Sequence, residues 1–150
     1  MQVTVISGLL AVFFYLMGSV FQGMNFASNK DTRKLVFLFG GLALLTHAIS
    51  AYGVIQSADG FHFGLFEIST LITLSISLVV LISSMRKPLE ILFLALFPLA
   101  MLSIIASLAI RSEYPPTSMS LGLASHVLIS ILAYSFITIA ALQASFLAYQ

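Results

Sequence analysis

The sequence predicts an all-α fold, a polytopic transmembrane helix bundle, and three observations carry this prediction. Of the 150 residues, 60% are hydrophobic and only 7% are charged, whereas roughly a quarter of the residues of an ordinary soluble domain are charged. Most of the charged residues lie in short gaps between long apolar runs. Each run is close to the roughly 20 residues that a helix needs to cross the hydrocarbon layer. The runs are therefore expected to span a membrane.

Five apolar runs define the expected helices, at residues 3–26, 35–56, 65–85, 89–110 and 121–148. The first run is expected to be a retained helix and not a cleaved signal peptide. No basic segment precedes it, and its apolar stretch is longer than the apolar region of a signal peptide. Pro88 opens the fourth helix, where a missing amide donor costs little. The fifth run ends without a basic residue, which predicts that the chain is the first part of a longer polypeptide.

Orientation follows from the basic residues in the short loops. Short loops on the cytoplasmic side of a membrane carry an excess of Lys and Arg. The loops after the first and third runs hold Lys30, Arg33, Lys34, Arg86 and Lys87, whereas the loops after the second and fourth runs hold only Arg111. The N-terminus is therefore predicted to lie outside the cytoplasm.

Several function classes find no support in the sequence. Cysteine is absent, so disulfides and thiolate metal sites are excluded, and a metal would need His, Met or oxygen ligands. A net charge of +1 is too small for the concentrated basic face of a nucleic-acid-binding protein. No Gly-rich phosphate loop, glycosidase-like carboxylate pair, nucleophile elbow or HExxH motif occurs, so an enzyme is not predicted. The expected surroundings are a lipid bilayer, without nucleic acid.

His47 is the first candidate functional residue. It lies about nine residues, or roughly 13 Å of helix, from the outer end of the second run. Its neighbours at three- and four-residue spacing are small, which predicts a helix interface on this face. The imidazole either makes an interhelical hydrogen bond or acts as a ligand or proton-handling group, and an intramembrane histidine favours the second interpretation. The predicted face comprises Gly40, Ala43, His47, Ser50 and Ala51.

His126 repeats this arrangement about five residues inside the fifth run. Both histidines fall in the outer half of the membrane, and we expect them to face one cavity open to the outside. Two imidazoles without cysteine make a poor zinc site but suitable axial ligands for haem iron, as a pair or as alternatives. The stripe predicted to pack comprises Gly122, His126, Ser130, Ala133, Ile137, Ala140 and Ala144.

Two further polar residues lie near the predicted outer ends of the helices. Glu67 falls in the first turn of the third run, where the helix dipole stabilises a carboxylate, so it is a cap or a functional group. His62 lies in the preceding loop among aromatic residues, and a loop histidine is more often solvated or interfacial than a ligand. The first run offers another packing face, made of Gly8, Ala11, Tyr15, Gly18 and Gln22.

Two segments resemble the cytochrome c assembly family, the CcsA and HemX type of haem-handling membrane protein. The first reads LTHAISAYGVIQSADGFHFGLFEISTLI from Leu45 to Ile72. In it Thr46–His47 matches the family's transmembrane histidine, and Phe66–Glu67 matches its aromatic-Glu pair. The second reads SHVLISILAYSFITIAAL from Ser125 to Leu142, and places His126 at the family's externally facing haem-ligand histidine.

The resemblance implies that residues 1–150 are the N-terminal five-helix part of a cytochrome c assembly type membrane domain. The whole protein would sit in the bacterial inner membrane and bind haem at the outer side for delivery to apocytochrome c, with other assembly proteins as partners. The haem would be b-type and non-covalent, with His47 and His126 as candidate iron ligands and Glu67 as a residue of the haem cavity or of the propionate region. The alternatives are a transporter or channel for protons, metal ions or a small solute, and a membrane scaffold whose histidines only form hydrogen bonds.

Overall fold

A computed structural model describes residues 2–28, 32–58, 60–86, 89–110, 115–116 and 118–149. Within these ranges the chain forms α1 (Gln2–Ser28), α2 (Arg33–Ile55), α3 (Leu65–Ser84), α4 (Phe93–Ala109) and α5 (Leu121–Tyr149). All five are long and apolar enough to cross a membrane, if the turn before α4 is counted with it. The protein is therefore a multi-pass, all-α integral membrane protein, as the sequence predicts. Lys30, Lys87, Pro88 and Arg111 lie outside the described residues.

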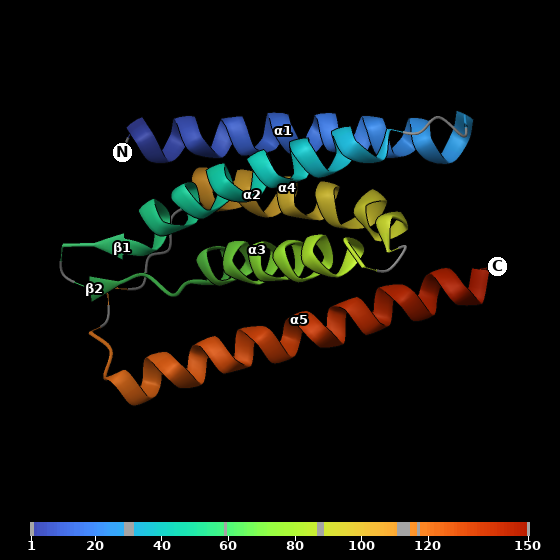
Figure 1. The fold of residues 1–150 in the computed structure, drawn as a ribbon. Helices are drawn as coiled ribbons and strands as arrows, with labels where there is room; N and C mark the ends of the chain where they lie inside the picture. Colours follow the sequence, from blue (N-terminus) through green and yellow to red (C-terminus); the bar gives the residue numbers. More distant parts are fainter. Residues whose placement is uncertain are drawn as a thin grey trace.

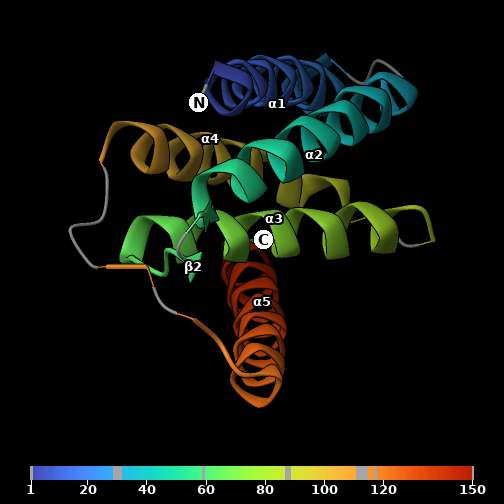
Figure 2. The same cartoon turned by 90° about the vertical axis from the view of Figure 1, so that its left-hand side faces the viewer.

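The helices are stacked in layers, with α1 at one face and α5 at the other (Figure 1). The first helix packs against α2 and α4, and α3 packs against α2, α4 and α5. In both views α5 lies below α3, as the outermost helix (Figures 1 and 2). Among the described elements α5 packs chiefly against α3, so most of its surface is exposed.

Two short elements depart from the predicted helices: a hairpin begins at Gln56, the last residue of the predicted run 35–56, and a 3-10 turn replaces the first residues of the predicted run 89–110. A two-stranded antiparallel hairpin follows α2, with β1 (Gln56–Ser57) paired to β2 (Gly60–Phe61). Gly60 has a φ of 136°, a conformation that residues with a side chain rarely adopt. A single 3-10 turn, η1 (Glu90–Leu92), precedes α4. The hairpin lies at the same end of the molecule as the N-terminus (Figure 1), which is the predicted outer end.

The hydrophobic core lies where α1, α2, α3 and α4 meet. Its centre is aromatic: the Phe93 and Phe97 rings stack at 4.7 Å between centroids, and the Tyr15 ring lies 5.1 Å from Phe97. Small residues on α1 let α4 come this close. A Cβ atom added at Gly18 would lie 2.7 Å from Cε2 of Phe97, which is shorter than a tolerable contact. The packing face predicted for α1 is buried along its whole length.

Arg33 contacts several elements at the opposite end of the molecule, which is the predicted cytoplasmic end. Its Nε donates to Oε1 of Glu90 at 2.7 Å, and its guanidinium also donates to the Ser84 carbonyl at 2.9 Å. The same guanidinium lies 5.5 Å from the centre of the Phe37 ring. One side chain therefore connects the start of α2, the end of α3 and the turn before α4.

Candidate functional site

His47 is completely buried between three helices, and both nitrogens of its ring have partners. Nδ1 lies 3.1 Å from the Tyr15 hydroxyl on α1, and Nε2 lies 2.8 Å from the Thr70 hydroxyl on α3. A neutral imidazole has one donor and one acceptor nitrogen, and each hydroxyl can serve as donor or acceptor. The three side chains therefore satisfy each other inside the membrane.

The local sequence explains why His47 reaches this position. The predicted small-residue face of α2 is confirmed, since Gly40, Ala43, Ser50 and Ala51 are all buried with His47. Small side chains let α1 approach α2 closely enough for a tyrosine hydroxyl to reach the imidazole. The sequence places Tyr15 on a packing face but does not identify it as a partner of His47. The pairing joins residues 32 positions apart, so no local pattern could reveal it.

A buried polar stripe on α3 includes Thr70, and of its members the sequence prediction included only Glu67. The Thr73 hydroxyl lies 2.6 Å from the Ser103 hydroxyl on α4, which joins these two helices. Polar residues at three- and four-residue spacing were a usable signal, because that spacing puts them on one helix face. All members of the stripe are at least nine-tenths buried: Glu67, Thr70, Thr73, Ser77 and Ser84.

Glu67 lies in a polar cavity at the predicted outer end, and only 4% of its surface is exposed. The cavity has a volume of about 500 Å³ and is bordered by α1, α2, the hairpin, α3 and α4. It brings Glu67 together with His62, which was expected to be a solvated or interfacial loop residue and which is partly buried here. The polar residues around the cavity are Thr4, Gln56, Ser57, His62, Glu67 and Ser107.

A second, apolar pocket of about 280 Å³ lies on the α5 side of the hairpin. Tyr52, Phe61 and Phe63 form its aromatic wall, and Ile131 of α5 lines it as well. Gln56 borders both this pocket and the polar cavity. Nothing in the sequence alone indicated that the hairpin separates a polar cavity from an apolar one.

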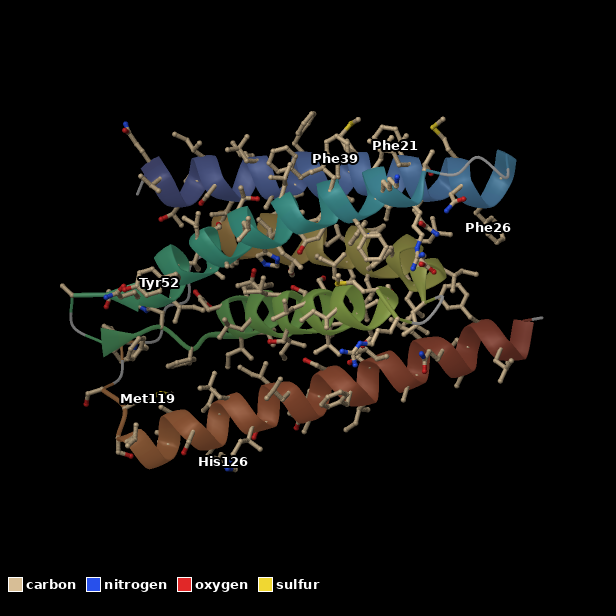
Figure 3. The ribbon with its side chains drawn as sticks, viewed as in Figure 1. Phe21, Phe26, Phe39, Tyr52, Met119 and His126 are labelled. Carbon is tan, nitrogen blue, oxygen red and sulfur yellow. The ribbon has the colours of Figure 1, made fainter. Side chains whose placement is uncertain are left out.

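His126 lies near the start of α5, as the sequence predicts, but it does not lie on a packed face. The stripe expected to pack was wrong: His126 is exposed, and its side chain points away from the other helices (Figure 3). The face that packs instead is rotated by one residue, with Ile131 and Ser135 buried. Because α5 is apolar all around, its hydrophobic pattern does not distinguish a packed face from a lipid face. The structure consequently does not bring His126 and His47 to a common cavity.

Together the fold and this site define a multi-pass helical membrane protein with a buried polar cluster and a polar cavity at one end. Among the described residues, no three His, Asp or Glu side chains gather as a metal site, although haem iron needs only one or two axial ligands from a protein. Comparison of the chain with family models, curated proteins and solved structures finds no match.

Proposed function

We propose that this chain is part of a haem-binding membrane protein that delivers haem at the outer side of the bacterial inner membrane for c-type cytochrome maturation. The two segments that resemble the cytochrome c assembly family support this proposal. The first runs through the second half of α2, the hairpin and the start of α3, and the second lies in α5. Both include residues at the predicted outer end, where haem would be held for apocytochrome c.

The observation that carries the proposal is the position of His126. Its imidazole is exposed on a face of α5 that packs against none of the described elements. A polar, ionisable side chain is costly when it faces hydrocarbon, so such a residue usually contacts another protein segment or a ligand. Haem iron would bind this imidazole, and the apolar helix surface beside it would contact the macrocycle.

Among the described residues, one axial ligand for haem iron is better supported than two. His126 has an accessible ring, whereas both ring nitrogens of His47 take part in hydrogen bonds. Ligation by His47 would require one of these bonds to break, at about 1 kcal/mol net for a typical hydrogen bond. We therefore assign His126 as the primary iron ligand and keep His47 as the second candidate. Glu67, which was expected in the haem cavity or in the propionate region, lies in the polar cavity at the same end.

Haem, when bound, would supply an iron centre whose potential and reactivity depend on its axial ligands. The contributions of the chain itself are the imidazole of His126, the apolar helix surface around it and the fixed position of α3 beside α5. No covalent bond between this chain and haem is required.

Absorption spectroscopy of the full-length protein, purified after haem-replete expression, tests the proposal. We expect a Soret band that His126→Ala abolishes or shifts, while the matched variant His62→Ala leaves it unchanged. His47→Ala distinguishes the two assignments, because a second axial ligand would change the band. Absence of bound haem in the wild-type protein would overturn the proposal. A Soret band that neither His126→Ala nor His47→Ala changes would also overturn it.

A second candidate function is supported by a different observation. The polar cavity contains Glu67, and one helical turn further Thr70 contacts the buried His47 and, through it, Tyr15. Such a series of polar groups is typical of a path for protons or a small solute in a transporter or channel. Flux into proteoliposomes that depends on His47 and occurs in haem-free protein would favour this function over haem delivery.

A further inference from the structure

An apolar groove runs along the surface between α2 and α3, which pack side by side (Figure 1). Its volume is about 590 Å³, and all nine described residues that border it are apolar. Leu38, Leu45 and Leu78 are among them, and each is about half exposed or more. Because these helices span a membrane, exposed apolar surface on them contacts lipid. The groove is therefore open to the bilayer.

The length of the groove matches the hydrocarbon of one leaflet. From Phe37 to Ala48, which border its two ends on α2, the helix rises by roughly 16 Å. The hydrocarbon core of a bilayer is roughly 30 Å thick, so one leaflet contributes about 15 Å. The groove begins near the predicted cytoplasmic end of α2 and reaches the middle of the helix. There it meets the apolar pocket beside the hairpin, because Ala48 and Leu74 line both.

Lys34 places a positive charge at the entrance of the groove. It lies in the first turn of α2, four residues before Leu38, so the two residues share a helix face. Its side chain is exposed and forms no ion pair within the described part of the chain, whereas the neighbouring Arg33 is paired with Glu90. The first turn contains no acidic residue, and the positive end of the helix dipole adds to the charge. This entrance therefore favours an anion.

We propose that the groove binds one anionic phospholipid of the cytoplasmic leaflet, with an acyl chain along α2 and α3 and the phosphate at Lys34. Two observations select this occupant. The charge of Lys34 complements an anionic head group, and basic residues beside membrane helices on the cytoplasmic side attract such lipids. The groove is also continuous with the apolar surface that contacts the bilayer. This site does not depend on haem and goes beyond the function proposed above.

Native mass spectrometry of the haem-free, full-length protein in detergent tests the proposal by titration with phosphatidylglycerol. Two controls separate the head group from the chain. Phosphatidylcholine with the same acyl chains has no net charge, and glycerol 3-phosphate has the anion without a chain. We expect saturable binding of one phosphatidylglycerol, several-fold tighter than that of phosphatidylcholine, and no competition by glycerol 3-phosphate.

Substitutions of Lys34 test the assignment of the head group. Lys34→Gln should weaken phosphatidylglycerol binding about fivefold, the contribution of one basic side chain near a membrane surface, whereas Lys34→Arg should retain it. Arg86 lies beyond the end of α3, at the same end of the molecule, so Arg86→Gln removes an equal charge and should weaken binding less. Equal losses in Lys34→Gln and Arg86→Gln would indicate general attraction to charge and overturn the assignment of Lys34.

Gly41 allows the groove itself to be blocked. A Cβ atom added at Gly41 would meet no described atom of a neighbouring element within 4 Å, so the side chain of Gly41→Leu can extend into the groove. This variant should weaken phosphatidylglycerol binding about tenfold or more. Gly23→Leu on α1 is the matched control, because a Cβ atom there also has open space and Gly23 does not border the groove. If Gly41→Leu does not fold, as judged by circular dichroism, the Lys34 variants carry the test.

Several outcomes would overturn the proposal. One is equal affinity for phosphatidylglycerol and phosphatidylcholine, and another is phosphatidylglycerol binding that neither Lys34→Gln nor Gly41→Leu changes. Oxidative dimerisation of Leu45→Cys in membranes, together with absence of lipid binding, would identify a second copy as the occupant. Absence of lipid binding, together with loss of stability in Gly41→Leu but not in Gly23→Leu, would identify another helix of the same chain. Because haem-free protein is used, failure here leaves the proposed haem function untouched.

Discussion

The Tyr15 hydroxyl and Nδ1 of His47 lie 3.1 Å apart in the interior of the helix bundle. Their rings meet edge to face, with centroids separated by 5.8 Å. Since both side chains are completely buried, this contact connects α1 and α2 through polar atoms that have no access to bulk water. It also holds the imidazole in one orientation, with its other nitrogen directed at Thr70.

Tyr15→Phe should lower stability by about 1 kcal/mol, because it removes one partner of a buried imidazole nitrogen, and interhelical hydrogen bonds in membranes contribute about this much or less. Reversible unfolding of purified protein in mixed micelles measures the change. Tyr134→Phe is the matched control, since Tyr134 is 59% exposed on α5. Equal stability of the two variants would contradict a structural role for the Tyr15 hydroxyl.

The contact between Thr73 and Ser103 should behave as a coupled pair. Thr73→Val and Ser103→Ala remove the 2.6 Å contact between their hydroxyls, separately or together. In a double-mutant cycle we expect a coupling free energy of about 0.6 kcal/mol, the average for interhelical hydrogen bonds in a membrane protein. Additive effects of the two substitutions would show that each hydroxyl is satisfied by its own helix instead.

Gly18→Ala should destabilise the protein by about 1–3 kcal/mol, which is the usual range for an overpacked core. The added methyl group would lie 2.7 Å from the Phe97 ring, and Phe97 is itself fixed between Tyr15 and Phe93. Gly23→Ala on the same helix is the control, because a methyl group there would meet no atom of the neighbouring described elements within 4 Å. Thermal unfolding of both variants measures the difference, and a tolerated Gly18→Ala would show that Phe97 can move.

Arg33→Lys should have a small effect that depends on salt. Lysine keeps the charge but cannot reach Glu90 and the Ser84 carbonyl with the same planar group. Because the Arg33 side chain is 49% exposed, solvent screens the pair, and we expect a loss of about 0.2–1 kcal/mol that shrinks at high ionic strength. Unfolding at low and high salt tests this, and a loss that does not change with salt would indicate a packing effect against Phe37.

The predicted orientation can be tested because the chain contains no cysteine. Ser57→Cys in the hairpin should react with a membrane-impermeant thiol reagent added outside intact cells. Lys34→Cys, at the exposed start of α2, should react only after the membrane is opened. The reverse pattern would show that the N-terminus faces the cytoplasm and would move the polar cavity to that side.

The sequence alone determined the five helices, because a long apolar run in a membrane must satisfy its backbone hydrogen bonds internally. The expected spans 65–85 and 121–148 differ from Leu65–Ser84 and Leu121–Tyr149 by a single residue at their ends. The burial of His47 and of Tyr15 could also be predicted, since small residues at helical spacing mark a packing face.

Only the tertiary structure decided which side chains meet. The partners of His47 come from α1 and α3, and the cavity around Glu67 is assembled from segments that are distant in sequence. The error at His126 has the same cause. A helix that is apolar on every side can turn any face toward its neighbour, so the choice depends on the shape of α3, which periodicity along α5 does not encode.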